Sequence, residues 1–120
     1  ERVVKVLWPE ALGSRQALEV EAAAFADCCR YLLLDAGSAG GGHGRSIDAT
    51  YLQQAVMPKD WFLAGGLGPD TVAAALAACA PFGLDCNSGV EDAPGIKNPD
   101  KIAQVLRLAG RNIQQRGERS

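Results

Sequence analysis

The chain has 120 residues, of which 48% are hydrophobic, and a formal net charge of −2 at pH 7. This length and composition suit one domain with a buried core. The scattered basic residues argue against a nucleic-acid-binding surface, and no run of residues is apolar and long enough to span a bilayer. We therefore expect a cytoplasmic protein with neither nucleic-acid nor membrane partners. The sequence begins in a predicted strand without an initiator Met, so we also expect it to be part of a larger polypeptide.

The cysteines favour reduced thiols over disulfides or a metal site. None of them has CxxC spacing, and two are adjacent in sequence; they are Cys28, Cys29, Cys79 and Cys86. Neighbouring cysteines do not easily bond to each other. His43 is the single histidine and has no evident partner ligand. We predict no metal site.

The first half of the chain predicts two strands and two helices. Residues 3–8 are rich in β-branched side chains and form a strand that Pro9 ends. Ser14 is the predicted cap of a helix whose apolar face carries Leu18, Ala22, Phe25 and Cys29. Residues 31–35 form the second strand, and a glycine-rich loop follows. A short helix after that loop is indicated by Ile47, Tyr51 and Ala55, with Asp48 near its start.

The second half repeats the alternation. Residues 61–64 form a third strand that runs into Gly65 and Gly66. A helix is predicted to start at Gly68-Pro69-Asp70, since Pro suits the first helical position, and to carry Val72, Leu76 and Cys79 on one side. Residues 82–86 form the fourth strand. Asn98-Pro99-Asp100 opens the last helix, with a predicted buried face of Ile102, Val105, Leu106 and Ala109.

This order, β-α-β-α-β-α-β-α, predicts an α/β fold with parallel strands and right-handed crossovers. Two arrangements satisfy it: a small open sheet covered on both faces, or part of a (β/α)₈ barrel. A complete barrel needs about 200 residues or more, and this chain supplies four βα units. Residues 1–120 are therefore expected to form a single domain.

The candidate functional residues follow the strands. Asp35 ends the second strand, and the loop behind it contains Gly41, Gly42 and Gly44. Glycine lets backbone N–H groups turn toward a bound anion, and α/β proteins gather their chemistry at the carboxyl ends of their strands. The stretch indicates one carboxylate beside an anion-binding loop. The plainer alternatives are an Asp that caps a turn and a flexible linker.

Three segments in order resemble the carboxyl-terminal half of phosphoribosylanthranilate isomerase: LLLDAGSAGGGHGRSIDATYL, WFLAGGLGPDTVAAAL and GLDCNSGVEDAPGIKNPDKI. That family is a (β/α)₈ barrel of tryptophan biosynthesis. The resemblance implies that the four predicted strands correspond to barrel strands five to eight. It also implies an aldose–ketose isomerase that rearranges N-(5-phosphoribosyl)anthranilate to 1-(2-carboxyphenylamino)-1-deoxyribulose 5-phosphate without a cofactor.

The resemblance also implies roles for individual residues. Asp35 matches the general acid, and Asp85 matches an Asp that faces the substrate. The phosphate contacts fall on Gly65, Gly66, Ser88 and Gly89, and the loop with Gly41, Gly42 and Gly44 would close over the substrate. The general base of the family is a cysteine in a Lys-Ile-Cys-Gly motif that this sequence lacks. The chain alone is therefore expected to be inactive.

Two other functions remain open: a non-catalytic half-barrel that binds a phosphorylated ligand or a partner protein, and an isomerase or epimerase of a related phosphosugar pathway. Half a barrel leaves two unpaired strand edges and an apolar inner face. We therefore expect self-association or pairing with a missing amino-terminal half-barrel. For Lys5, a side chain that reaches solvent and one that lines the pocket are equally open. For Glu91, a loop acid is favoured over a residue that faces the ligand.

Overall fold

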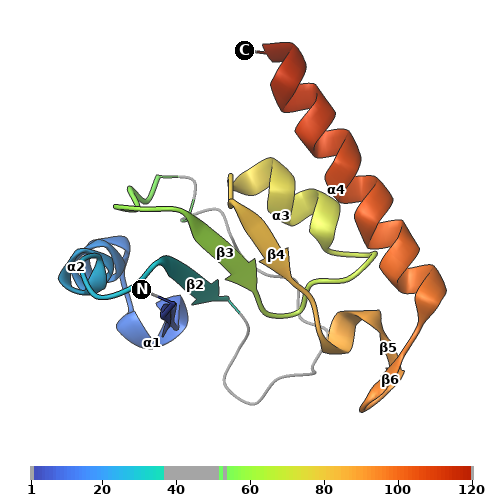
Figure 1. The fold of residues 1–120 in the computed structure, drawn as a ribbon, viewed down its shortest axis with the longest axis horizontal. Helices are drawn as coiled ribbons and strands as arrows, with labels where there is room; N and C mark the ends of the chain where they lie inside the picture. Colours follow the sequence, from blue (N-terminus) through green and yellow to red (C-terminus); the bar gives the residue numbers. More distant parts are fainter. Residues whose placement is uncertain (1, 37–51, 53, 120) are drawn as a thin grey trace.

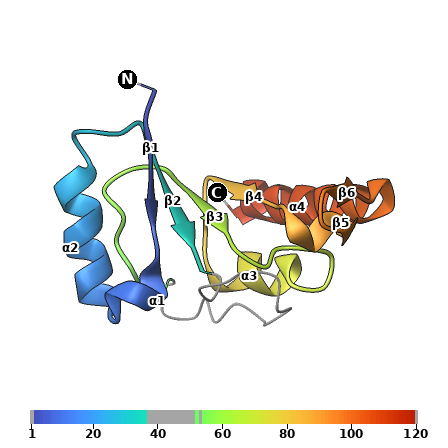
Figure 2. The same ribbon diagram turned by 90° about the horizontal axis from the view of Figure 1, so that it is seen from below.

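A computed structural model describes residues 2–36, 52 and 54–119. Within these residues, one parallel sheet contains β1 (Val4–Leu7), β2 (Tyr31–Asp35), β3 (Trp61–Ala64) and β4 (Gly83–Asp85), in that spatial order. Each strand pairs with the next in sequence, and their carboxyl ends meet at one edge of the sheet (Figures 1 and 2). The predicted α/β fold with parallel strands is confirmed.

The helices flank this sheet. They are α1 (Pro9–Leu12), α2 (Arg15–Phe25), α3 (Val72–Ala78) and α4 (Pro99–Arg119). In both views α2 lies beside β1, whereas α4 lies beyond the opposite end of the sheet, where it packs against α3 (Figures 1 and 2). The predicted cap of α2 is confirmed, since the Ser14 hydroxyl accepts a hydrogen bond from the Ala17 N–H at 3.1 Å. No helix in the described part of the chain combines the length and apolarity needed to cross a bilayer.

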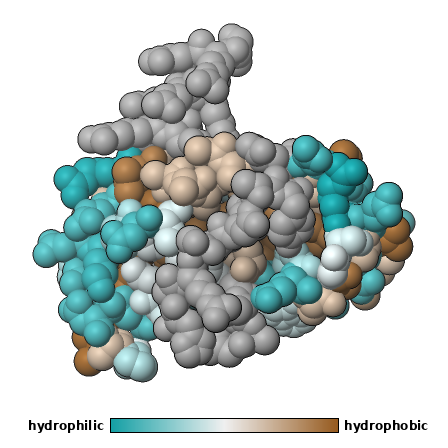
Figure 3. Space-filling view, turned by 180° about the vertical axis from the view of Figure 1, so that it is seen from behind, coloured by the Kyte–Doolittle hydropathy of each residue, from teal (hydrophilic) through white to brown (hydrophobic). Residues whose placement is uncertain are grey.

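The two faces of the sheet differ in burial. In β2, Leu32 and Leu34 are fully buried, whereas Tyr31, Leu33 and Asp35 are only half-buried. The buried face packs against α2 and α3 in one core, to which Leu18, Ala22, Leu63 and Ala75 contribute. We call the other face, which carries Tyr31, Leu33 and Asp35, the open face of the sheet. Large hydrophobic side chains are also exposed away from this face of the sheet, where they lie among hydrophilic side chains (Figure 3).

Aromatic rings gather at the amino ends of the strands. Tyr31, Phe62 and Phe82 lie with ring centroids 5.2 to 5.7 Å apart. The Phe62 ring lies over Gly83 of the neighbouring strand, so close that a Cβ at Gly83 would overlap it. The open face is therefore apolar near these amino ends.

Several predicted features are corrected. Helix α3 begins at Val72 rather than at Pro69, because the Gly68 carbonyl accepts hydrogen bonds from Thr71 and Val72 in a tight turn. Cys29 and Cys79 lie beyond the ends of α2 and α3, although both are buried.

The last helix was predicted with a fully buried face, and that prediction was wrong in part. Val105 is buried, but Ile102 is 37% exposed and Leu106 is 67% exposed. Ala55 is not helical, and the rest of the predicted short helix, including Ile47, lies outside the described residues.

A polar segment between β4 and α4 was not predicted. It contains the 3₁₀ helix η2 (Ser88–Val90) and an antiparallel hairpin of β5 (Glu91–Ala93) and β6 (Ile96–Lys97). The hairpin connects the end of the sheet to the start of α4. It therefore stands beside the carboxyl edge, where function was expected.

Candidate active site

Two carboxylates lie in line across the carboxyl edge of the sheet. Asp35 ends β2 and pairs in register with Ala64, and Ala64 pairs in register with Asp85 of β4. Residues in register on parallel strands point to the same face, so both side chains emerge on the open face. Because neighbouring strands are about 4.8 Å apart, the two Cα atoms are separated by roughly 10 Å. Asp35 is half-buried and Asp85 is exposed.

The turn after β3 has a backbone that glycine adopts most readily. Gly65 and Gly66 have φ of 99° and 66°, a region that side chains with a Cβ rarely enter. The Thr71 hydroxyl donates to the Gly66 carbonyl at 2.7 Å and accepts from the Gly68 N–H at 3.0 Å. This turn is therefore fixed at both ends by one side chain.

The turn after β3 touches the segment after β4 through backbone atoms. A Cβ built on Gly68 would lie 2.5 Å from the Gly89 carbonyl oxygen. A Cβ on Gly89 would overlap the Leu67 carbonyl oxygen. Both positions therefore require glycine for close packing. The contact brings two of the predicted phosphate-binding segments together.

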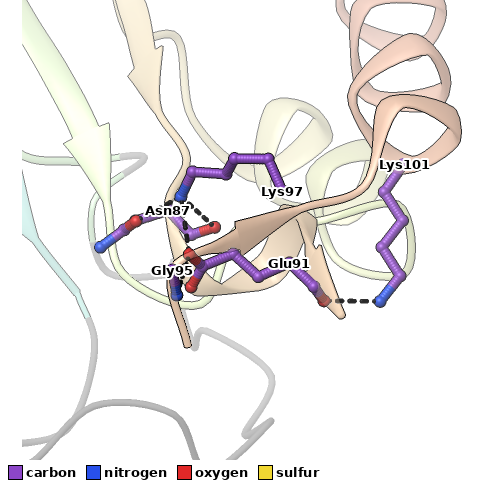
Figure 4. A network of polar contacts seen from close by, with 5 residues as sticks. All are labelled: Asn87, Glu91, Gly95, Lys97 and Lys101. Carbon is purple, nitrogen blue, oxygen red and sulfur yellow. Dashed lines mark hydrogen bonds and ion pairs between the residues drawn. The ribbon is translucent and has the colours of Figure 1, made fainter. Parts of the chain in front are cut away.

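A polar network holds the hairpin beside η2 (Figure 4). Glu91, whose side chain is only 10% exposed, accepts hydrogen bonds from Lys97 at 3.1 Å and from the Gly95 N–H at 2.9 Å. Lys97 also donates to the side-chain oxygen of Asn87 at 2.6 Å and to its carbonyl oxygen at 3.3 Å. Lys101 of α4 donates to the Glu91 carbonyl at 2.8 Å. Glu91 is thus an anchored side chain rather than a plain loop acid.

The structure places the predicted site residues unevenly. Asp35, Gly65, Gly66, Asp85, Ser88 and Gly89 all lie at or just beyond the carboxyl ends of β2, β3 and β4. Gly41, Gly42 and Gly44 lie outside the described residues, as does His43. Sequence reasoning missed the roles of Asn87 and Lys97, and the only signal was that both fall in a segment that resembles a known family.

Cys86 directly follows Asp85 and does not provide a base. Burial, and then the negative charge of Asp85, raise the pKa of its thiol above the ordinary value of 9.0. A raised pKa keeps the thiol protonated near neutral pH. Within the described residues, no group of three or more His, Cys, Asp or Glu side chains is placed to hold a metal ion.

An apolar groove lies between α3, β4 and α4. Its volume is about 490 Å³, and its lining includes Leu76, Phe82, Leu84, Cys86, Ile102, Val105 and Leu106. Neither Asp35 nor Asp85 lines it. The groove is therefore distinct from the carboxylate pair.

Comparison with known proteins identifies the family. The model of N-(5'-phosphoribosyl)anthranilate (PRA) isomerase matches residues 2–107. The chain belongs to the phosphoribosylanthranilate isomerase family. A phosphoribosylanthranilate isomerase of Desulfovibrio desulfuricans is 46% identical over 119 residues, which are 99% of this chain and 55% of that protein.

Solved structures of phosphoribosylanthranilate isomerases share the fold. The crystal structure of TrpF from Jonesia denitrificans is 38% identical with a TM-score of 0.67, covering 90% of this chain and 48% of that one. A phosphoribosyl anthranilate isomerase in complex with reduced 1-(o-carboxyphenylamino)-1-deoxyribulose 5-phosphate has a TM-score of 0.65 at 24% identity, covering 91% and 48%. The chain thus spans about half the length of the relatives it matches, and its four parallel βα units are equivalent to half of their (β/α)₈ barrel.

Proposed function

We propose that this chain carries the general acid and the phosphate-binding part of a phosphoribosylanthranilate isomerase, and that it forms the carboxyl-terminal half of the barrel, strands five to eight. The observation that carries the proposal is the alignment of Asp35 and Asp85 across Ala64 in a chain that the family model matches over residues 2–107. The glycine turns after β3 and β4 touch at the same edge.

The reaction requires a proton donor and a proton acceptor. In the proposed mechanism, Asp35 donates a proton to the ribose ring oxygen as the bond from C1 to that oxygen breaks, which leaves a C1–nitrogen double bond. A base then removes the proton from C2, which gives an enolamine. The enolamine gains a proton at C1 and loses the proton of its C2 hydroxyl, which gives the C2 ketone. C2 is oxidised and C1 is reduced by the same electron pair, so no external oxidant or cofactor is needed. A positioned acid contributes about 10²–10⁴-fold to such a step.

The phosphate and the sugar are bound by the neighbouring groups in this proposal. Backbone N–H groups of Gly65, Gly66, Ser88 and Gly89 contact the phosphate, as glycine turns commonly do at the ends of the last two strands of such barrels. Asp85 accepts hydrogen bonds from the amino or hydroxyl groups of the substrate. The phosphorylated ketose analogue bound to a related isomerase supports this substrate class.

The chain is proposed to lack turnover by itself. The sequence has no Lys-Ile-Cys-Gly motif, and burial, followed by the charge of Asp85, raises the pKa of the Cys86 thiol. An amino-terminal half-barrel is the proposed source of the base. It would pair with the edge strands β1 and β4 and cover the apolar groove, where Leu106 is 67% exposed.

The test supplies the missing half as a separate polypeptide, taken from the amino-terminal part of the Desulfovibrio desulfuricans relative. Turnover of N-(5-phosphoribosyl)anthranilate is expected only when both halves are present. In the mixture, Asp35→Asn is expected to lower kcat by about 10²–10⁴-fold. Asp60→Asn is the matched control, because Asp60 is exposed at the opposite end of the sheet. An unchanged kcat for Asp35→Asn would exclude Asp35 as the acid, and phosphate binding without turnover in the mixture would favour a binding half-barrel.

A further inference from the structure

The ammonium group of Lys97 makes three contacts with acceptor atoms of the protein. Its ammonium group contacts the Asn87 side-chain oxygen at 2.6 Å, the Asn87 carbonyl at 3.3 Å and Glu91 at 3.1 Å. A lysine ammonium has three N–H donors, and these three contacts account for all of them. Lys97 is therefore arranged to hold protein groups in place.

The acceptor that orients Lys97 is itself fixed. The Glu91 side chain is 10% exposed, and its Oε2 also accepts from the Gly95 N–H at 2.9 Å. Gly95 has a φ of 81°, which forms the turn of the hairpin. A nearly buried carboxylate needs such partners. The hairpin thus presents Glu91 to Lys97 in one orientation.

The group that Lys97 holds leads directly into η2. The Asn87 carbonyl accepts the Val90 N–H at 3.1 Å as well as Lys97 at 3.3 Å. Ser88 and Gly89 lie between Asn87 and Val90, and Gly89 packs on the backbone of Leu67 and Gly68. The placement of Asn87 therefore sets how the two glycine segments meet.

We propose that Lys97, oriented by Glu91, is a positioning residue for the phosphate-binding segment Ser88-Gly89. This inference rests on the proposed function, because it deepens the role of the same site. Lys97 acts through Asn87 and not through its charge on the ligand. Loss of either member of the pair lets Asn87 move and weakens phosphate binding.

The direction in which one substitution changes the phosphate affinity distinguishes a positioning role of Lys97 from direct attraction between its charge and the phosphate. Glu91→Gln removes a negative charge beside Lys97, so a direct role of Lys97 on the anion predicts tighter phosphate binding. Positioning predicts weaker binding, because Lys97 loses its charged acceptor. The two mechanisms therefore give opposite results for the same variant.

The experiment titrates inorganic phosphate into the ¹⁵N-labelled 120-residue chain and follows the amide signals of Ser88, Gly89, Gly65 and Gly66. Lys97→Met and Glu91→Gln are each expected to weaken phosphate binding on the order of tenfold. The double variant is expected to be no weaker than Lys97→Met. Lys97→Arg, which keeps donors for both acceptors, is expected to recover most of the affinity.

Lys101→Met is the matched control, because this substitution also removes one positive charge. The Lys101 side chain contacts the Glu91 carbonyl but does not contact Asn87. Its phosphate affinity is expected to stay within about twofold of the unchanged chain. Tighter binding by Glu91→Gln, or equal losses in Lys97→Met and Lys101→Met, would overturn the positioning role and leave the phosphate site intact. A wild-type chain whose four amide signals do not move with phosphate would overturn the site itself, and the positioning role with it.

Discussion

Asp35 and Asp85 occupy the same register of the parallel sheet, one on each side of Ala64. They come from different βα units, yet both emerge at one edge and on one face. Their surroundings differ, because Asp35 is half-buried and Asp85 is exposed. A half-buried carboxyl is shielded from water and suits proton transfer, whereas an exposed one suits binding. This difference in burial is consistent with the two roles proposed above, an acid at Asp35 and a substrate-binding group at Asp85.

The first prediction concerns Asp85. In the isomerase reconstituted from two halves, Asp85→Asn is expected to raise KM on the order of tenfold, because the amide is a weaker acceptor for the substrate than a carboxylate. The kcat value is expected to change much less than it does in Asp35→Asn. Steady-state kinetics of both variants measure the split. A fall in kcat for Asp85→Asn as large as that for Asp35→Asn would contradict the assignment.

The second prediction concerns the backbone contact between the turn after β3 and η2. Gly89→Ala is expected to lower the free energy of unfolding by about 1–3 kcal/mol, because the new Cβ overlaps the Leu67 carbonyl. Gly110→Ala in α4 is the control, since no described atom outside the local backbone of its own helix lies within 4 Å of its Cβ position. Alanine there is expected to stabilise the helix by about 0.5–1 kcal/mol. Urea unfolding checks both, and a neutral Gly89→Ala would contradict the close approach.

The third prediction concerns the groove. Leu106→Lys is expected to weaken association with the amino-terminal half by at least about tenfold, because it places a charge in an apolar contact. Val20→Lys is the control, since Val20 of α2 is 69% exposed and Leu106 is 67% exposed, and Val20 lies outside the groove. Neither change is expected to alter the stability of the chain itself by more than about 0.5 kcal/mol. Sedimentation of the mixed halves measures the association, and equal affinities for the two variants would argue against this docking face.

The fourth prediction concerns the pH dependence of stability. Burial, followed by Asp85, raises the pKa of Cys86 above 9.0. The unfolded chain therefore releases this proton first, and the contribution of Cys86 to the free energy of unfolding is complete below pH 9 and decreases as the pH rises above it. Cys86→Ser is expected to flatten that decrease, whereas Cys28→Ser, at an exposed position, is expected to keep the original slope. Denaturant unfolding between pH 7 and pH 10.5 checks this, and parallel curves for all three proteins would rule it out.

Much of the sheet followed from local pattern. Short runs of bulky residues such as 31–35 and 61–64 form the strands as predicted, because each run is bounded by glycine or a charged residue. The carboxyl edge then collects Asp35, Asp85 and the glycine turns by topology alone. Those placements needed no knowledge of side-chain contacts.

What pattern did not predict depends on contacts distant in the chain. The apolar spacing of α4 shows which residues share a face, but the helix leaves Ile102 and Leu106 uncovered. Helix α3 starts late because Gly68 and Thr71 form a turn before it. The Thr71 hydroxyl accepts a hydrogen bond from the Gly68 N–H, and the Gly68 carbonyl accepts one from the Thr71 N–H. This turn outweighs the preference of Pro69 for a first helical position. Strands as short as Ile96–Lys97 carry no detectable periodicity, so the hairpin that anchors Asn87 could not be predicted from hydrophobic periodicity.

The spatial order of the strands has a consequence for synthesis. Because each strand pairs with the one that precedes it in the chain, the sheet can grow unit by unit as the polypeptide leaves the ribosome. Asp35 would be in place early, whereas Asp85, Ser88 and Lys97 arrive with the last unit. A nascent chain stopped after β3 would hold the acid but nothing to orient a ligand against it. Assembly of the proposed pocket therefore depends on the last βα unit, which supplies β4 and the segment that follows it.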